Sequence, residues 1–275
     1  MTHTQRTVAG IAYDRRGPSG ALPVLLLHAG IADRRMWDPQ WDGLTANRDT
    51  IRLDLRGFGA STSRPLNDTV DNAADVIDTL GQLAVTRCHL VGSSFGAGVA
   101  TEVALTRPDL VGSLLLCPPG GSLLAELTPD LQHFLDAERA ALARNDIDAA
   151  VDANVASWVI GPGRTESDVE PAVVAAVRRM QRNAFEVTLS WDDVAEAELA
   201  PPALDRLTDL TQPVLIVVGG HDLDTTRDAV QRIYAAAPRV RRVDWPDVAH
   251  LPSMEKPQQF LDLLLDWADA NDQRS

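Results

Sequence analysis

The sequence predicts an α/β protein: a mostly parallel, doubly wound sheet with an inserted helical cap. Two observations carry this prediction. Short apolar runs alternate with amphipathic helical stretches in both terminal parts of the chain, and the alternation stops in the middle, where helical patterns follow one another. With 275 residues, 45% of them hydrophobic, the chain is long enough to bury a large core.

Six short apolar runs are predicted to form the strands of the sheet. The first, 24–28, is continuously apolar and lies between Pro23 and Gly30, which is typical of a strand buried on both faces. Runs of the same character occupy 51–55, 88–92, 113–117, 214–218 and 240–245. We expect the segment 7–13, which precedes a turn rich in glycine and proline, to add an antiparallel hairpin at one edge.

Amphipathic helices are predicted between the strands. In 72–83 and in 257–270, apolar residues recur at helical spacing and form one apolar face. Strands that alternate with helices pair in parallel, so this pattern favours a sheet covered by helices on both faces.

The alternation breaks between Pro118 and Gln212, where we expect helices and no strand. Thr128 followed by Pro129 is a typical helix start, with threonine as the N-cap, and 168–185 indicates a second long helix. The predicted domains are an α/β core of 1–120 and 209–275 and a helical cap, or lid, of 121–208. A separate helical domain with its own partner is the alternative.

The charge balance limits the partners that we expect. The chain has 25 basic and 39 acidic residues, a formal net charge of -14, which disfavours nucleic acid and anionic membrane surfaces. No apolar run approaches the roughly 18 residues of a membrane span, and the segment 1–6 lacks the apolar core of a signal peptide. We therefore expect a cytoplasmic protein, a monomer or homodimer, that acts on a small-molecule substrate.

Neither a metal nor a cofactor is expected. Cys88 and Cys117 both lie in apolar, strand-like runs, which favours buried free thiols over a disulfide, and two cysteines alone do not make a zinc site. The single histidines His89, His133 and His221 lack ligand spacing. The sequence also contains no Walker-type phosphate loop.

The most informative stretch is 90–96, Leu-Val-Gly-Ser-Ser-Phe-Gly, in which an apolar strand runs into Gly-x-Ser-x-Gly and then into a helical pattern. A strand that turns into a helix so sharply strains the central Ser94, and only residues as small as Gly92 and Gly96 fit beside it. Ser94 would then stand at a helix N-terminus, where free N–H groups stabilise a developing oxyanion. Ser94 is therefore the candidate nucleophile.

A serine nucleophile needs a base, and the base needs an orienting acid. Asp222 follows the predicted strand 214–218, at the end where doubly wound sheets place ligand groups, and His250 follows the last strand. The order Ser94, Asp222, His250 is that of the α/β-hydrolase fold. Asp224 is the alternative acid.

Over nearly its whole length the chain resembles the α/β-hydrolase-fold superfamily, in its serine hydrolase form. Besides the Gly-x-Ser-x-Gly motif, residues 54–61 resemble the family's D-x-R-G-x-G-x-S loop, and 218–222 resemble the segment that carries its acid. Residues 249–257 resemble the family's catalytic histidine loop and final helix. The resemblance implies a triad of Ser94, His250 and Asp222.

The run His28-Ala29-Gly30-Ile31 resembles the family's H-G-x-x oxyanion loop, with alanine in place of the usual glycine. The resemblance places one oxyanion N–H on Gly30 and the second on Phe95, directly after the nucleophile. Ile31 is the alternative to Gly30. We expect His28 to brace the loop by hydrogen bonds and Arg56 to form a structural ion pair.

The predicted function is hydrolysis of a small ester, lactone or related acyl substrate through an acyl-enzyme. A serine at this sharp strand-to-helix turn, the nucleophile elbow, argues against the haloalkane dehalogenases and most epoxide hydrolases of this fold. Those enzymes resemble this chain but use an aspartate at the same position. The run 35–40 is similar to enol-lactone hydrolases. The alternatives are a cofactor-free oxygenase, a lyase or a carbon-carbon bond hydrolase with the same triad, and a small-molecule receptor without catalysis.

The cap is expected to shape the substrate pocket. Five large side chains of the cap are candidates either for the pocket wall or for the core of the cap itself: Phe134, Trp158, Met180, Phe185 and Trp191.

Overall fold

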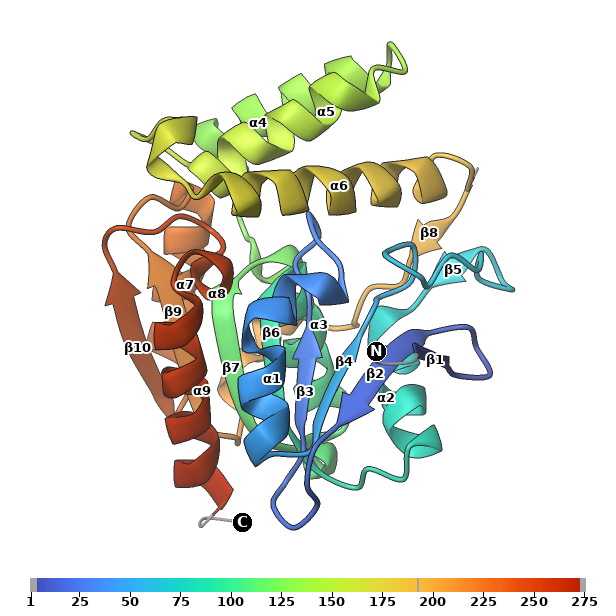
Figure 1. Cartoon of the computed structure of the whole chain (residues 1–275), viewed down its shortest axis with the longest axis vertical. Coiled ribbons are helices and arrows are strands. Elements are labelled where there is room, and N and C mark those ends of the chain that lie inside the picture. The colour runs from blue at the N-terminus through green and yellow to red at the C-terminus, as the bar shows by residue number, and fades with distance from the viewer. Residues whose placement is uncertain (1–3, 192, 273–275) are drawn as a thin grey trace.

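The computed structural model describes residues 4–191 and 193–272. Residues 1–3, part of the N-terminal segment considered above, and residues 192 and 273–275 lie outside this description. A twisted eight-stranded sheet runs through the centre with helices on both faces, and further helices lie across one end of it (Figure 1).

All six predicted apolar runs form strands of this sheet. In sheet order, the strands are β1 (Gln5–Arg6), β2 (Ala12–Arg16), β4 (Thr50–Leu53), β3 (Val24–Leu27), β6 (Cys88–Ser94), β7 (Val111–Pro119), β9 (Val214–Gly219) and β10 (Val240–Trp245). β2 pairs antiparallel with both β1 and β4, and the other neighbours are parallel. The predicted antiparallel hairpin therefore lies at the edge of the sheet, and the prediction of a mostly parallel sheet is confirmed.

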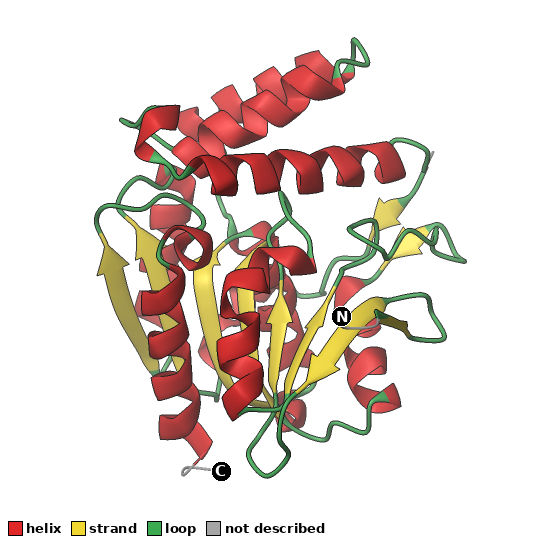
Figure 2. Cartoon of the chain, in the orientation of Figure 1, coloured by secondary structure: helices red, strands yellow, loops and turns green. Residues whose placement is uncertain are grey.

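Helices cover the sheet in two layers (Figure 2). One layer holds α1 (Asp38–Asn47), α8 (Pro252–Glu255) and α9 (Pro257–Asp272), and the other holds α2 (Asn72–Gln82), α3 (Phe95–Thr106) and α7 (Asp224–Ala236). Short 3-10 turns are η1 (Arg34–Trp37), η2 (Pro108–Leu110), η3 (Gly121–Leu123), η5 (Glu166–Asp168) and η6 (Ala203–Asp209).

The two layers explain why the strand sequences are continuously apolar. Successive side chains of a strand point to opposite faces, so Leu26 joins the core beneath α1 and α9 while Leu25 and Leu27 join the core beneath α2 and α3. All three side chains are fully buried. Burial of a leucine side chain is worth about 1.5–3 kcal/mol relative to exposure, so the strands are stabilised from both faces.

The inserted helices α4 (Pro129–Leu142), α5 (Ile147–Asn154) and α6 (Pro171–Thr188) lie over the carboxyl ends of the strands (Figure 1). A π-helix, η4 (Val155–Ile160), continues α5. α4 begins as expected, because the Thr128 hydroxyl accepts a hydrogen bond from the backbone N–H of Leu131.

The second long cap helix begins three residues later than predicted, at Pro171 and not at Asp168. Glu166–Asp168 form a separate 3-10 turn, closed by a reciprocal hydrogen-bonded cap between Thr165 and Asp168. Proline disfavours the helical conformation in the residue before it but suits the first turn of a helix, so Glu170 stays extended and α6 starts at Pro171.

The expectation of no strand between 118 and 212 is wrong at one place. β8 (Ala195–Glu196) pairs in parallel with β5 (Thr69–Val70) in a second, two-stranded sheet. β8 is only two residues long and both are exposed, so it has no apolar alternation by which a sequence pattern could mark it.

Within residues 4–191 and 193–272, no helix combines the length and the apolar character needed to cross a bilayer.

Candidate active site

Ser94 lies at the junction of β6 and α3 with φ 52° and ψ -113°, a backbone conformation that side-chain-bearing residues rarely adopt. The flanking glycines permit this turn. A Cβ atom on Gly92 would lie 2.3 Å from the carbonyl oxygen of Gly96, and one on Gly96 would lie 2.5 Å from that of His28. Backbone strain of this kind costs about 1–3 kcal/mol and clusters at functional sites.

Gly96→Ala is expected to destabilise the protein, because the new methyl group would overlap the carbonyl oxygens of Leu27 and His28 at the end of β3. Overpacking of this kind typically costs about 1–3 kcal/mol, measurable as a lower Tm by calorimetry. Gly81→Ala is the matched control, since Gly81 lies in α2 with nothing within 4 Å of an added Cβ. Equal Tm values for the two variants would contradict the tight elbow.

The structure brings the three predicted triad residues together. The Oγ of Ser94 lies 2.7 Å from Nε2 of His250, and Nδ1 of His250 lies 2.8 and 2.9 Å from the two carboxyl oxygens of Asp222. The backbone N–H of Leu223 donates to the same carboxyl group at 2.8 Å. An ionised carboxylate only accepts hydrogen bonds, so Nδ1 of His250 carries the proton and Nε2 is free to accept from the serine hydroxyl.

Asp224, the alternative acid, points elsewhere. Its carboxyl group accepts hydrogen bonds from the Thr128 hydroxyl and from the backbone N–H of Thr225. The geometry therefore places Asp222, and not Asp224, beside the histidine.

A second serine and histidine pair lies near the opposite end of the sheet. Ser113 Oγ lies 2.8 Å from Nδ1 of His89, whose Nε2 lies 3.0 Å from Asp272, and Asp272 also pairs with Arg48 at 2.6 Å. Both Ser113 and His89 are fully buried, and burial lowers the pKa of His89. His89 precedes Ser94 by five residues along β6, which separates the two sites by about 17 Å. This second pair joins α9 to the sheet.

The predicted oxyanion loop lies against the elbow. The carbonyl oxygen of His28 accepts a hydrogen bond from the backbone N–H of Gly96 at 3.1 Å. A Cβ atom on Gly30 would lie 3.3 Å from the Cβ of Phe95. The two residues named as oxyanion donors, Gly30 and Phe95, are therefore neighbours in space.

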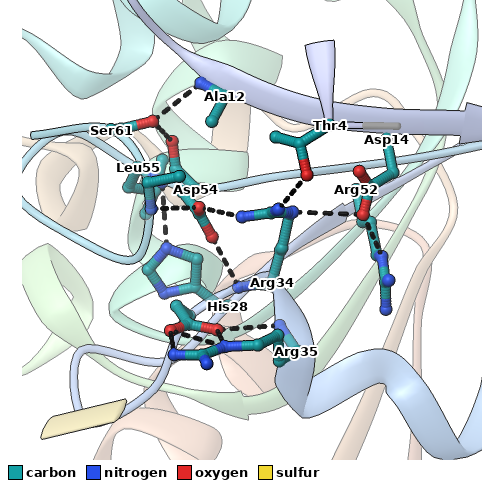
Figure 3. Close-up of polar contacts among 12 residues, drawn as sticks. Thr4, Ala12, Asp14, His28, Arg34, Arg35, Arg52, Asp54, Leu55 and Ser61 are labelled. Atoms are coloured by element: carbon teal, nitrogen blue, oxygen red, sulfur yellow. Dashed lines mark hydrogen bonds and ion pairs between the residues drawn. The ribbon is translucent and has the colours of Figure 1, made fainter. Parts of the chain in front are cut away.

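His28 braces this loop, as expected (Figure 3). Its Nδ1 lies 2.8 Å from the carbonyl oxygen of Ala29, and its Nε2 lies 2.9 Å from the backbone nitrogen of Leu55. Burial lowers the pKa of His28, which favours a neutral ring that donates through Nδ1 and accepts through Nε2.

Asp54, the first residue of the D-x-R-G-x-G-x-S loop, ties neighbouring loops together (Figure 3). Its carboxyl group accepts from the backbone N–H groups of Arg34 at 2.8 Å and Ala60 at 2.7 Å, and it forms an ion pair with the Arg34 side chain. The Ser61 hydroxyl donates to the carbonyl oxygen of Asp54 at 2.8 Å, and Arg34 also pairs with Asp14. The motif thus fixes the loop that follows the oxyanion residues.

Arg56 of the same motif forms an ion pair with Asp75 on α2 at 2.6 Å, with both side chains largely buried. This confirms the structural role expected for Arg56.

Trp158 of the π-helix is a cap residue that contacts the triad. Its backbone carbonyl oxygen accepts from the N–H of His250 at 3.3 Å, and its ring centroid lies 4.4 Å from that of the imidazole. The Phe134 ring packs edge-on against the Trp158 ring, with 5.3 Å between the two ring centroids. Phe134, Trp158 and Met180 are buried in the core that the cap shares with the sheet. Trp191 is half-buried and lies near Gly57.

A cavity of about 410 Å³ adjoins the residue after the nucleophile. Phe95, Val99 and Glu102 of α3 form one wall, and the segment 196–199 faces them. Burial raises the pKa of Glu102, and the Ser122 hydroxyl opposes this by hydrogen bonding. The cavity therefore offers a mixed apolar and acidic lining beside the elbow.

Gly120 is a site residue whose role the sequence did not reveal. A Cβ atom there would lie 2.8 Å from the Oγ of Ser94, so only glycine leaves the hydroxyl room at this turn after β7. The sequence offers a signal in the run Pro118-Pro119-Gly120-Gly121, but a run of proline and glycine marks a turn without indicating a site.

Both cysteines are free and buried, as expected. Burial raises the pKa of Cys88 to about 12 and raises that of Cys117 as well, so neither thiol is an activated nucleophile. Among the described residues, no group of three or more His, Cys, Asp or Glu side chains has the arrangement of a metal site.

Residues 24–263 match the family described as the alpha/beta hydrolase family. Because the match spans most of the 275 residues, the chain belongs to this family. The architecture agrees with it in its mostly parallel sheet and its helical insertion over the strand ends.

Several proteins of this fold are similar to the chain over nearly their whole length. A RutD protein of Pseudomonas savastanoi pv. phaseolicola, whose name describes a carbamate hydrolase, is 26% identical over 263 residues, 90% of this chain and 94% of its own. The solved structure of Est816, described as an N-acyl homoserine lactone degrading enzyme, is 25% identical with a TM-score of 0.71, covering 93% of this chain and 96% of its own. The enol-lactonase of Burkholderia xenovorans LB400 superposes with a TM-score of 0.73 at 20% identity, over 93% of this chain and 95% of its own.

Proposed function

We propose that the protein is a serine hydrolase that cleaves a small ester, lactone or related acyl substrate through an acyl-enzyme. The observation that carries the proposal is the continuous chain of hydrogen bonds from Ser94 through His250 to Asp222. In this mechanism His250 takes the serine proton as Ser94 attacks the carbonyl carbon, and Asp222 stabilises the imidazolium that forms. The protonated His250 then gives its proton to the leaving oxygen, and water repeats the sequence on the acyl-enzyme.

The proposed oxyanion donors are the backbone N–H groups of Gly30 and Phe95. The first turn of α3 leaves the N–H of Phe95 without a partner inside the helix, and the dipole of α3 has its positive end there. Gly30 lies against Phe95. Preorganised donors of this kind contribute about 2.7–4 kcal/mol each to stabilisation of the transition state.

The substrate class is proposed from chemistry and likeness together. Est816, at 25% identity, degrades N-acyl homoserine lactones by its description, and the RutD relative is named for carbamate hydrolysis. Both reactions involve attack on an acyl carbonyl carbon.

Burst kinetics with p-nitrophenyl acetate, followed by a panel of short esters and lactones, tests the proposal. An acyl-enzyme mechanism with slow deacylation gives a rapid release of nitrophenol in proportion to the enzyme concentration. Absence of both a burst and steady turnover on every ester and lactone would favour the oxygenase, lyase or receptor alternatives.

Trp158→Ala is expected to change the preference between acyl groups. The Trp158 ring packs on the His250 imidazole, so its loss opens space next to the reacting carbonyl and alters the kcat/KM ratio of a bulky to an acetyl ester by about 10-fold or more. Trp191→Ala is the control, because that ring lies near Gly57. If Trp158→Ala also keeps the wild-type ranking of substrates and only loses thermal stability, the pocket is lined by other residues.

A further inference from the structure

The loop that follows the π-helix packs directly on the two loops that carry the acid and the base. Gly161 has φ 79°, and a Cβ atom on it would lie 2.1 Å from the carbonyl oxygen of His221 and 3.0 Å from the Cβ of Ala249. The carbonyl oxygen of Pro162 lies 3.0 Å from Nδ1 of His221. The cap therefore touches the residue before Asp222 and the residue before His250.

A buried ion pair crosses this contact. Arg164 of the cap loop pairs with Glu255 of α8 at 2.6 Å, and their side chains are only 6% and 7% exposed. The other carboxyl oxygen of Glu255 accepts from the backbone N–H of Ala249 at 2.8 Å. Arg164 also donates to the carbonyl oxygen of Asp168, at the 3-10 turn before α6, at 2.9 Å.

Two successive backbone amides of the histidine loop are thus held by groups tied to the cap. The N–H of Ala249 donates to Glu255, whose carboxyl group is bound to Arg164, and the N–H of His250 donates to the carbonyl oxygen of Trp158. π-helices widen the backbone turn and recur at functional sites. Here the N–H of Gly161 bonds to the carbonyl oxygen of Ala156, five residues back, and the carbonyl of Trp158 accepts from the His250 loop.

We propose that Arg164 and Glu255 are positioning residues that couple the placement of the cap to the placement of His250. The inference rests on the function proposed above, and it deepens it: the cap shapes the substrate pocket and also aligns the base. Buried ion pairs add little net stability against apolar replacements. In some proteins, buried ion pairs select one packing arrangement over alternative arrangements. Here the selected arrangement of the cap on the histidine loop sets the distance from His250 to Ser94.

The test is the double variant Arg164→Met/Glu255→Gln, which removes both charges together and leaves no lone buried charge. Glutamine retains an oxygen for the Ala249 N–H, so the loop keeps its local bond while the cap loses its tie. Misplacement of a catalytic group by about 1 Å lowers rates by up to about 100-fold. We expect kcat for p-nitrophenyl acetate to fall about 10- to 100-fold with KM changed by less than about threefold.

Arg164→Lys provides the conservative comparison. Lysine keeps the charge, but its ammonium stands on a shorter side chain than the Nη2 atom through which Arg164 bonds to both Glu255 and the Asp168 carbonyl. Its kcat should lie between the wild-type value and that of the double variant. The matched control is Asp247→Asn/Lys256→Met, which removes an exposed ion pair from the same loop region and should leave kcat unchanged.

A second readout does not depend on ester hydrolysis. The proton on Nδ1 of His250, which is hydrogen-bonded to Asp222, gives a downfield resonance in the proton NMR spectrum. Hydrogen exchange measures the protection of the backbone amides of Ala249 and His250. In the double variant, the Nδ1 proton and the His250 amide, which bonds to the cap carbonyl of Trp158, should exchange with solvent faster than in the control. Wild-type kcat together with wild-type exchange would overturn the positioning role.

The two proposals fail in different ways. If Ser94→Ala retains ester turnover, the proposed function fails, while the exchange of the His250 and Ala249 amides still decides whether the ion pair orders the loop. If Ser94→Ala is inactive but the double variant keeps wild-type kcat and exchange, the function stands and the coupling is rejected.

Discussion

Ser94→Ala is expected to lower kcat/KM for any ester or lactone substrate by about 10³-fold or more, because it removes the atom that attacks the carbonyl carbon. The fold should be unchanged, since alanine keeps the Cβ atom and the Ser94 side chain is only half-buried at the elbow. Steady-state kinetics and a thermal melt of the same preparation measure both effects.

Ser113→Ala is the matched control for that result, since Ser113 also bonds to a histidine but at the buried end of the sheet. We expect its activity to remain close to that of the wild type, with some loss of stability because His89 loses a hydrogen bond. Activity of Ser94→Ala within tenfold of the wild type would discard Ser94 as the nucleophile, and loss of activity in Ser113→Ala alone would point to the other pair.

Asp222→Asn is expected to be the second most damaging change, with kcat lowered by about 10²- to 10⁴-fold. An amide at this position no longer stabilises the imidazolium, and its N–H₂ group favours the wrong tautomer of His250. Asp224→Asn should alter stability slightly and activity little, because Asp224 bonds to Thr128 and Thr225. A larger loss of activity in Asp224→Asn would place the acid two residues further along the chain.

The sheet could be predicted because its strands are buried on both faces. A run such as Val24–Leu27 is apolar at every position, and the helices between the strands carry one apolar face, so local pattern and tertiary position agree. The pattern of apolar residues is least informative where a strand is held by backbone pairing alone and carries no apolar side chains. β8 is therefore absent from the prediction, and the start of α6 was misplaced because helical spacing continues through 168–170 while Pro171 sets the first turn.

The residues of the candidate site could be named because each lies in a short local motif at the carboxyl end of a strand. Ser94 needs a glycine on either side, and both glycines lie in contact with backbone that allows no larger residue. The choice of Asp222 over Asp224 agrees with the observed geometry, since only Asp222 lies beside His250.

The partners of these residues could not be predicted from local motifs. Arg164 and Glu255 are 91 positions apart in the sequence, and neither spacing nor composition indicates that they meet. The same holds for Arg34 and Asp54, which join the 3-10 turn η1 to the loop after β4. Contacts of this kind depend on how the cap and the loops pack on the sheet. Local patterns in a single sequence carry no information about that packing.

Rapid quenching of the enzyme with an activated ester, followed by peptide mass spectrometry, tests the central claim most directly. We expect a single acyl adduct on Ser94 that forms during the burst, decays at the rate of steady turnover and is absent from Ser94→Ala. Turnover without any adduct, or an adduct on another residue that forms and decays at the rate of turnover, would contradict it.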